Sequence, residues 1–254
     1  MPTTTKSTTK FKKDIEILRV PDDMVEIKSD RFKGYEFLQE VYIPASVKTI
    51  GSKAFKDCYS LEKINISDGV TKIDASAFFD CSLEDIKLPG SVKYLGDSAF
   101  EYCDVLKSAD LGNNLDTIQP RTFYKCGSLT KVHIPDSVTT IGANAFYGCE
   151  SLKEVNIPDG VTSIGEHAFA YCGSIYYKGQ DVTNFIRKHD AFDVVKSLSD
   201  NDLPLTDSMF DKAMEARREG RLRGFVVKTK KRLSEREVPD IDYSDSDGLN
   251  LERS

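Results

Sequence analysis

Residues 129–151 read LTKVHIPDSVTTIGANAFYGCES, and this stretch decides the fold because its pattern recurs along most of the chain. Each full copy places a cysteine three residues after a phenylalanine. The cysteines follow one another at intervals of 23, 22, 23, 23 and 23 residues: Cys58, Cys81, Cys103, Cys126, Cys149 and Cys172. The interval of 22 reflects one residue missing between Cys81 and Leu83. A constant period of this length is typical of repeat proteins.

Seven units can be aligned, from Ile15 to about Ser174, and the first is a degenerate copy without the cysteine. Apolar residues occupy the fourth and sixth positions of a unit, as in Val132 and Ile134, which predicts a half-buried β-strand. Proline follows this strand in five units and ends it. A second short strand and an Ala-Phe turn, expected as a short helix or 3₁₀ segment, complete the coil.

One coil cannot bury its own apolar side, so we expect the coils to stack in parallel register, about 4.8 Å apart, around a shared core. The predicted fold class is a repeat solenoid of short parallel β-strands with turn or 3₁₀ segments, followed by a small α-helical C-terminal cap. The phenylalanines that precede the cysteines should form one buried aromatic stack: Phe55, Phe78, Phe100, Phe123, Phe146 and Phe169.

The unit at residues 129–151 resembles the BspA-type (Treponema pallidum-type) leucine-rich repeat, whose pattern is Leu-x-x-Ile-x-Ile-Pro-x-x-Val-x-x-Ile-Gly-x-x-Ala-Phe-x-x-Cys. The resemblance covers about 160 of the 254 residues. It implies a right-handed leucine-rich-repeat coil that acts in attachment or protein recognition rather than catalysis. The units at 15–37 and 106–128 depart from the pattern, so we expect a bend or a distorted turn at these two coils.

The six cysteines are consistent with disulfide bonds, because stacking brings equivalent residues of neighbouring coils within the Cα separation that a bridge needs. Their equivalent, inward-facing positions favour a column of buried free thiols instead. A zinc site is disfavoured, because the sequence has no Cys-x-x-Cys or paired Cys/His spacing. We therefore expect neither a metal nor a cofactor.

Composition limits the remaining possibilities. The chain carries 35 basic and 41 acidic residues, and its formal charge of −6 argues against a globally cationic nucleic-acid-binding protein. No window approaches the roughly 18 consecutive apolar residues of a spanning helix, and residues 1–14 read as a disordered arm without a secretory signal. These features predict a cytoplasmic protein, or a surface or secreted one if the chain is truncated.

Catalysis has little support in the sequence. The chain has three histidines and no phosphate-binding glycine loop, nucleophile elbow or metal-binding cluster. Asp110 and His133 should lie side by side on neighbouring coils, either as an acid/base pair or as a surface ion pair. Because no nucleophile or oxyanion donor accompanies them, we interpret the protein as noncatalytic.

The exposed positions of the first strand predict a binding surface. The third and fifth positions form two rows of mixed charge, which suit a polar protein partner more than a polyanion. An aromatic edge just after the phenylalanine column either recognises protein or sugar or covers the Ala-Phe turn. The candidate partner-binding residues are Tyr42, Lys63, Asn65, Lys87, Asp110, Lys131, His133 and Asn156 on the rows, with Phe79, Tyr102, Tyr124, Tyr147 and Tyr171 on the edge.

The repeat decays after Cys172. We expect the solenoid at residues 15–180, a helical cap and hairpin at 181–233, and an acidic disordered tail at 234–254. Helical spacing predicts one helix over 182–198, a second from Thr206 to Glu219 that stops at Gly220, and a third over 222–233, of which 225–227 alone could be a strand.

The segment 217–232 carries eight basic side chains against one acidic: Arg217, Arg218, Arg221, Arg223, Lys228, Lys230, Lys231 and Arg232. It is either a site for phosphate or an acidic partner, or a solvated helix face, and the acidic tail could fold back to screen it. The sequence as a whole predicts a noncatalytic protein-recognition module with no small-molecule substrate. The alternatives are a nucleic-acid- or phosphate-binding regulator that uses this segment, and a cell-surface adhesin for host protein or glycan.

Overall fold

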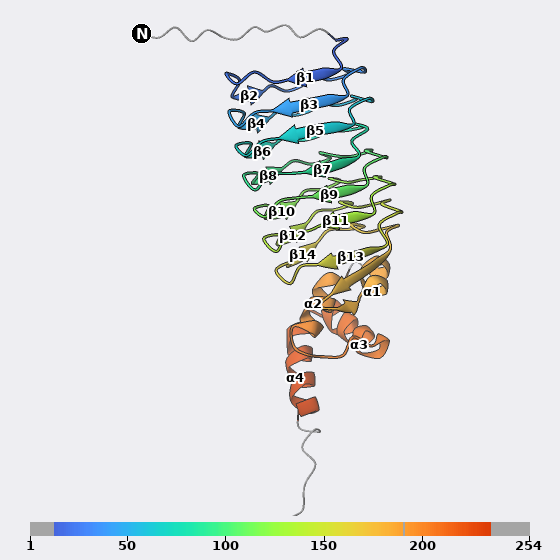
Figure 1. Ribbon diagram of the computed structural model, residues 1–254. Coiled ribbons are helices and arrows are strands. Elements are labelled where there is room, and N and C mark those ends of the chain that lie inside the picture. Colours follow the sequence, from blue (N-terminus) through green and yellow to red (C-terminus); the bar gives the residue numbers. More distant parts are fainter. Residues whose placement is uncertain (1–12, 190, 235–254) are drawn as a thin grey trace, which may run out of the picture. The chain divides into compact units, whose positions relative to one another are not determined.

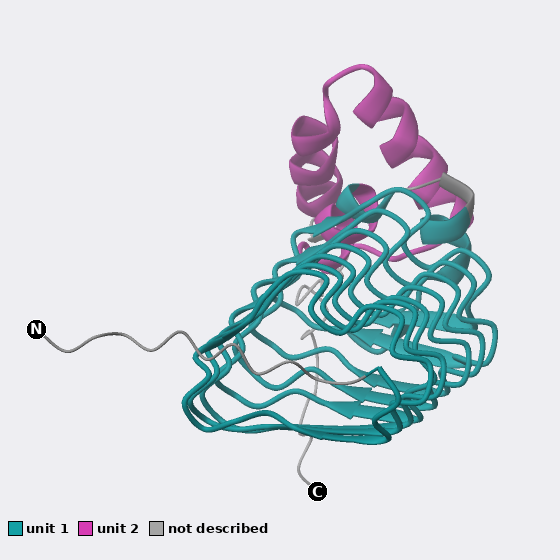
Figure 2. Cartoon of the chain, turned by 90° about the horizontal axis from the view of Figure 1, so that it is seen from above, with its two compact units in different colours: residues 1–193 teal, residues 194–254 magenta. Residues whose placement is uncertain are grey.

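The structure is a computed structural model that describes residues 13–189 and 191–234. The chain divides into two compact units, residues 1–193 and residues 194–254 (Figure 2). The expected N-terminal arm and acidic tail fall almost wholly outside the described residues. The domain boundaries expected from the sequence therefore stay predictions, and each unit is described by itself.

The first strands of the repeat lie side by side along unit 1 (Figure 1). Strands of neighbouring coils pair in parallel and one repeat apart, so that Leu18 lies opposite Val41 and Val41 lies opposite Ile64. This arrangement confirms the predicted solenoid of about seven coils with a last strand. The strands are β1 (Ile17–Arg19), β3 (Glu40–Ile43), β5 (Lys63–Ile66), β7 (Asp85–Lys87), β9 (Ser108–Asp110), β11 (Lys131–His133), β13 (Glu154–Ile157) and β15 (Ser174–Tyr177).

A second, two-residue strand follows in each coil, and successive coils repeat the same outline with a steady offset (Figure 2). Glycine closes this strand in several coils because the backbones approach closely there. A Cβ at Gly96 would lie 2.4 Å from the backbone nitrogen of Ala75 in the preceding coil. The second strands are β2 (Glu26–Ile27), β4 (Thr49–Ile50), β6 (Lys72–Ile73), β8 (Tyr94–Leu95), β10 (Thr117–Ile118), β12 (Thr140–Ile141) and β14 (Ser163–Ile164).

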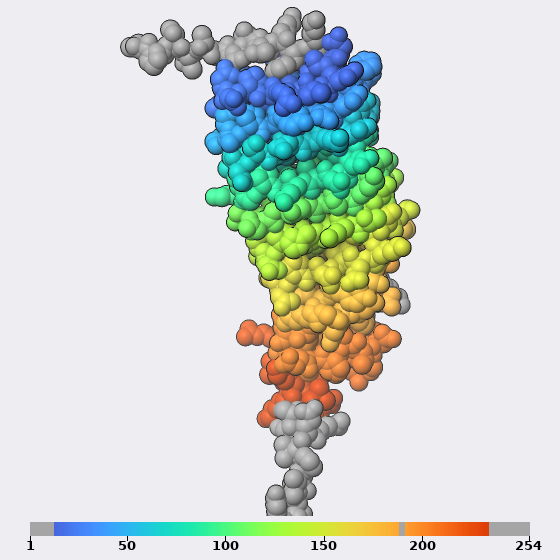
Figure 3. Space-filling view, viewed as in Figure 1, coloured from blue at the N-terminus to red at the C-terminus, as the bar shows by residue number. Residues whose placement is uncertain are grey.

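The core of unit 1 contains the predicted aromatic stack. Its ring centroids are 5.3–5.5 Å apart and its ring planes meet at 3–13°, from Phe32 in the first coil to Phe169 in the last. Every ring in the stack is at most 1% exposed. The space-filling view shows the coils around this stack as successive bands along unit 1 (Figure 3). The prediction of one continuous aromatic column is confirmed.

The six cysteines are buried and free, as predicted. Each thiol donates a hydrogen bond to the backbone carbonyl of the stacked phenylalanine in the preceding coil, at 3.0–3.2 Å, as Cys126 does to Phe100. Burial raises the pKa of the Cys58 thiol to about 11 and that of Cys103 to about 12. These thiols are therefore protonated packing groups that link one coil to the next.

The Ala-Phe segment forms neither a short helix nor a 3₁₀ segment in the described coils, which corrects the expectation. Its backbone N–H groups alternate in direction: Phe55 donates to Ala77 of the next coil at 2.8 Å, whereas Lys56 closes a turn on Lys53 at 3.1 Å. Because every second N–H leaves the coil, no helical hydrogen-bond series can form. Lys53 and Asp57 instead take left-handed φ values of 57° and 61°, a pair that recurs in every coil.

The sheet of first strands is interrupted twice, into the orders β1-β3-β5, β7-β9-β11 and β13-β15-β16, the last strand being β16 (Gln180–Asp181). The first interruption directly follows the residue missing between Cys81 and Leu83. The second strands are interrupted once, between β8 and β10, and this interruption borders coil 106–128, where a bend or a distorted turn was expected. Coil 15–37 pairs with its neighbour through both strands, so the distortion expected there was wrong. Nothing in the sequence explains the gap between β11 and β13.

Unit 1 ends with a short helix, α1 (Thr183–His189), which packs against β15. The N–H of Val182 donates to the carbonyl of Ile175 at 2.8 Å, and Ile186 is buried. The ring of Tyr177 meets that of Phe192 edge-on at 5.2 Å. Phe192 begins α2 (Phe192–Ser199), so the single helix predicted over 182–198 is two helices.

Unit 2 contains the two later helices predicted from the sequence, α3 (Asp207–Arg218) and α4 (Leu222–Ser234). The hydroxyl of Thr206 caps α3 by accepting from the N–H of Met209 at 3.3 Å. Gly220, with φ of 68°, ends it, and the N–H of Arg221 reaches back to the carbonyl of Ala216 at 2.7 Å. The alternative of a strand at 225–227 was wrong. Within 13–189 and 191–234, no helix has both the length and the apolar character required to cross a membrane.

Candidate binding surfaces

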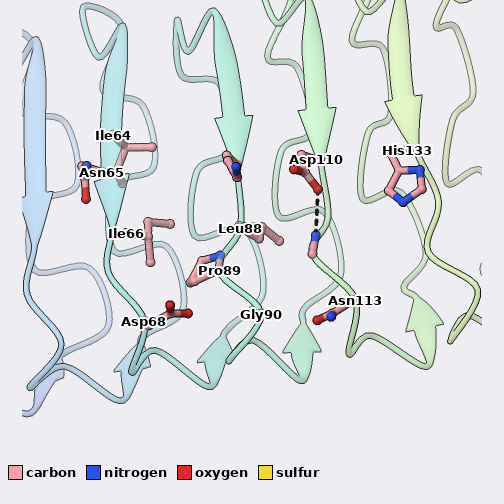
Figure 4. A pocket seen from close by; sticks show the side chains of 12 residues that line it. Ile64, Asn65, Ile66, Asp68, Leu88, Pro89, Gly90, Asp110, Asn113 and His133 are labelled. Atoms are coloured by element: carbon pink, nitrogen blue, oxygen red, sulfur yellow. Dashed lines mark hydrogen bonds between the residues drawn. The ribbon is translucent and has the colours of Figure 1, made fainter.

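An open groove lies on the first-strand face at the interruption between β5 and β7, with a volume of about 630 Å³ (Figure 4). We call it the strand-face groove. Four of the predicted fifth-position residues contribute to its lining, one from each of four successive coils: Asn65, Lys87, Asp110 and His133. Apolar side chains from β5 and from the end of β7 line the same groove, with Asp68 and Asn113 also bordering it. The sequence therefore predicted four of the polar residues of this groove, but it predicted neither Asp68 and Asn113 nor the groove itself.

The interruption explains why the groove forms at this place. Between β3 and β5 four residue pairs are in register, whereas β5 and β7 form no ladder. The inward side chain of Ile64 is consequently half-buried, while its counterpart Val41 is 1% exposed. The groove thus gives access to polar side chains and also to part of the apolar interior.

Asp110 and His133 occupy adjacent register positions on β9 and β11, as predicted. The carboxylate of Asp110 accepts the backbone N–H of Gly112 at 3.1 Å. Within the described part of the chain no hydrogen bond or ion pair joins Asp110 to His133. The arrangement thus provides a carboxylate, an imidazole, the Lys87 ammonium and the Asn65 amide as separate groups that can each bind a polar ligand.

The other predicted row residues lie outside the strand-face groove. Tyr42 and Lys63 belong to a self-paired cluster, in which Tyr42 donates to the Glu40 carboxylate at 2.8 Å and Lys63 lies 3.7 Å from the same carboxylate. The guanidinium of Arg19 covers the Tyr42 ring at 4.2 Å. Lys131 is exposed on β11, and Asn156 lies on β13 beyond the second interruption. The structure does not bring these four residues into one site.

The predicted aromatic edge is continuous. Neighbouring ring centroids are 5.0–5.8 Å apart along Phe79, Tyr102, Tyr124, Tyr147 and Tyr171. Two hollows of about 710 and 570 Å³ flank its last two rings. A hydrogen bond to Tyr171 raises the pKa of Tyr147. Whether the edge binds a ligand stays a prediction.

The hollow of about 710 Å³ also contains polar residues that sequence reasoning did not select: Asn144, His167 and Arg187. Asn144 and His167 are equivalent residues of successive coils, and each has a left-handed φ, of 57° and 56°. Their shared position in the repeat was a signal that could have identified them. Arg187 lies on α1, outside the repeat, and no periodic pattern pointed to it.

In unit 2 a groove of about 550 Å³ lies between α3 and α4, and we call it the α3–α4 groove. Three predicted basic-patch residues line it, Arg221, Lys228 and Arg232, together with Lys212. The sequence missed Lys212 because it lies on the preceding helix, outside the dense basic segment. The rest of the patch does not line this groove: Arg217, Arg218, Arg223, Lys230 and Lys231.

No group of three or more His, Cys, Asp or Glu side chains in residues 13–189 and 191–234 is arranged to hold a metal ion. The grooves described above present hydrogen-bonding, charged and aromatic groups.

The chain was compared with known proteins. The family model of the BspA type leucine-rich repeat region matches this chain in six copies, over residues 25–141 and 116–214. Among solved structures, the Treponema pallidum leucine-rich repeat protein is 28% identical over 56% of this chain and 79% of its own, with a TM-score of 0.45. A leucine-rich repeat protein from Bacteroides ovatus is 25% identical over 66% of this chain and 58% of its own, with a TM-score of 0.38.

The pneumococcal vaccine antigen PcpA is 22% identical over 64% of this chain and 62% of its own, with a TM-score of 0.32. No curated protein matches the chain. The family matches span residues 25–214, which is more than half of the sequence and includes nearly all the coils. The chain therefore belongs to the BspA-type leucine-rich repeat family.

Proposed function

We propose that this protein is a noncatalytic protein-recognition module whose contact surface is centred on the strand-face groove. Leucine-rich repeats commonly serve in protein binding or adhesion. The observation that carries the proposal is the convergence of Asn65, Lys87, Asp110 and His133, from four coils, on a single groove at an interruption of the sheet.

The chemistry of the groove favours a polar protein segment as the ligand. It offers one cation, two carboxylates, an imidazole and two amides within a few strands, so a complementary partner must present both charge signs. Half-buried Ile64 adds an apolar contact in the same groove. A mixed apolar and polar lining of this kind is typical of protein interfaces.

The test is a pull-down with the intact chain as bait, followed by quantitative mass spectrometry of the bound proteins. The groove variant carries K87A, D110A and H133A. The matched control carries K153A and E154A, two exposed residues of β13 and its flank that lie outside the groove and remove one positive and one negative charge, as K87A and D110A do. Both variants should keep the circular dichroism spectrum of the native chain.

We expect the native chain and the control to recover the same partner, and the groove variant to recover at least tenfold less of it. Direct titration of the purified partner should then give the same order of affinities. Equal recovery by the groove variant would place the contact surface elsewhere.

Binding of a phosphate-rich ligand or nucleic acid is the second candidate function, and the α3–α4 groove is the observation that favours it. Four basic side chains from α3, from α4 and from the residue just before α4 line this groove: Lys212, Arg221, Lys228 and Arg232. A polyanion held there should lose affinity steeply, by roughly a factor of ten or more, between low and physiological salt. Salt-independent binding of a single-stranded oligonucleotide, or none, would reject this candidate.

A further inference from the structure

The basic residues of the α3–α4 groove lie on one side of α4. At 100° per residue, Arg221, Lys228 and Arg232 point in nearly the same direction, as does Phe225, which also lines the groove. Lys212 reaches the groove from α3. The same rotation directs Arg223 and Lys230 to the opposite side of α4, away from the groove. The helix therefore separates its cations into a groove set and an outer set.

The groove set lacks compensating negative charge. No carboxylate lines the groove in the described part of the chain. Arg221 forms an ion pair with Glu219. Among the described residues, the side chains of Lys212, Lys228 and Arg232 form no ion pair or hydrogen bond. Three unpaired cations around one concave surface favour an anionic occupant.

A segment of opposite charge directly follows the groove residues in the sequence. Arg232 lines the groove, α4 ends at Ser234, and residues 235–254 contain seven acidic residues and two basic ones. From Arg221 to Arg232 the helix rises about 16 Å. An extended chain covers this distance in about five residues. Asp240 and the acidic residues after it are therefore within reach of every cation in the groove, whereas Glu235 and Glu237 reach only those near Arg232.

We propose that the α3–α4 groove binds the acidic segment 235–254 of the same chain. The carboxylates of the segment pair with Lys212, Lys228 and Arg232. A tether this short gives the segment an effective concentration on the order of millimolar, so modest attraction is enough to keep the groove occupied. An external phosphate-bearing ligand then has to displace the segment.

The experiment uses full-length chains and a fluorescein-labelled peptide of sequence 235–254, followed by fluorescence anisotropy at about 50 mM salt. One variant has a neutralised tail, with its seven acidic residues replaced by asparagine or glutamine. We expect the peptide to bind this variant at least tenfold more tightly than the native chain, whose groove is already occupied. Equal binding to both, or binding to neither, would overturn the proposal.

Two charge-reversal variants, both made in the neutralised-tail background, distinguish peptide binding at the groove from nonspecific electrostatic attraction. K228E with R232E should abolish peptide binding, whereas R223E with K230E changes the net charge equally and should preserve most of it. The control breaks only the exposed contact between Lys230 and Asp202 at 3.4 Å. If both double variants lose binding equally, the attraction is nonspecific and the proposal fails.

A second probe, sodium tripolyphosphate, distinguishes the tail from an external anion by isothermal titration calorimetry. With the tail in the groove, tripolyphosphate should bind the neutralised-tail variant at least fivefold more tightly than the native chain. The K228Q/R232Q variant, which keeps good helix-forming residues, should lose this binding. Equal affinity for the native and neutralised chains would assign the groove to external anions and refute the tail as its occupant.

Discussion

Replacing Phe123 with alanine tests the aromatic interior on which the solenoid depends. The Phe123 ring is fully buried, and the rings of Phe100 and Phe146 stack on its two faces at centroid distances of 5.4 and 5.3 Å. Emptying a buried aromatic site costs about 3–5 kcal/mol of unfolding free energy. Each ring-ring contact adds about 0.5–1.5 kcal/mol to the burial of area. We therefore expect F123A to lie in the upper part of the 3–5 kcal/mol range.

Two comparison variants divide this cost into its parts. Phe169 ends the stack, is 1% exposed, and stacks on Phe146 alone among the described rings. F169A should accordingly cost about 0.5–1.5 kcal/mol less than F123A, which is the value of one ring-ring contact. Phe37 is 61% exposed, so F37A should change stability by no more than about 0.5 kcal/mol.

Urea unfolding followed by far-ultraviolet circular dichroism is the suitable assay, because the chain contains no tryptophan. Repeat proteins can unfold in parts, so the slope and the midpoint of each curve must both be compared. A loss below about 1 kcal/mol for F123A, or equal losses for F123A and F37A, would refute the reasoning that the stack holds the coils together.

Three further predictions concern pH, turns and backbone contacts. Burial raises the thiol pKa to about 11 for Cys58 and about 12 for Cys103, above the roughly 8.5 of an exposed thiol, so the folded state holds these protons more tightly. The stability that these protonated thiols contribute is fully present below pH 8.5 and is lost as pH rises through 11–12. A urea midpoint that stays level from pH 8 to 10.5 would contradict this expectation. Lys53 is exposed and has a left-handed φ of 57°. K53G should raise the thermal midpoint of unfolding, because it relieves about 1–2 kcal/mol of backbone strain and the entropic cost of glycine is smaller. K53V should lower the same midpoint. G96A should cost about 1–3 kcal/mol in urea unfolding because its Cβ meets backbone 2.4 Å away, while G127A, with nothing within 4 Å, should be neutral; equal effects would reject the close approach.

The interior could be predicted because each of its positions repeats. A leucine, a phenylalanine and a cysteine recur about every 23 residues, and stacking turns each recurrence into a buried column. The turns could not be predicted in the same way. Lys53 and Asp57 share a left-handed conformation with chemically different residues in other coils, since hydrogen bonds to the next coil impose it. Side-chain identity therefore carries little information about these positions.

The candidate sites were predicted only in part. Register alone placed Asp110 beside His133 and ordered the aromatic edge, because residues one repeat apart must lie on adjacent strands. The sequence could not show which part of each column borders a groove. That depends on where strand pairing stops, and on residues such as Lys212 that approach from another helix.

A regular solenoid presents the same backbone in every coil, so only a difference between coils can direct a ligand to one place on its surface. Side chains provide one such difference, and the strand-face groove adds another. One residue is missing between Cys81 and Leu83, the ladder stops between β5 and β7, and the groove lies at this interruption. The second interruption, before β13, follows a unit of full length and forms no part of this groove. We therefore place the proposed contact surface on the coils that carry Asn65, Lys87, Asp110 and His133, and not along both full rows of unit 1.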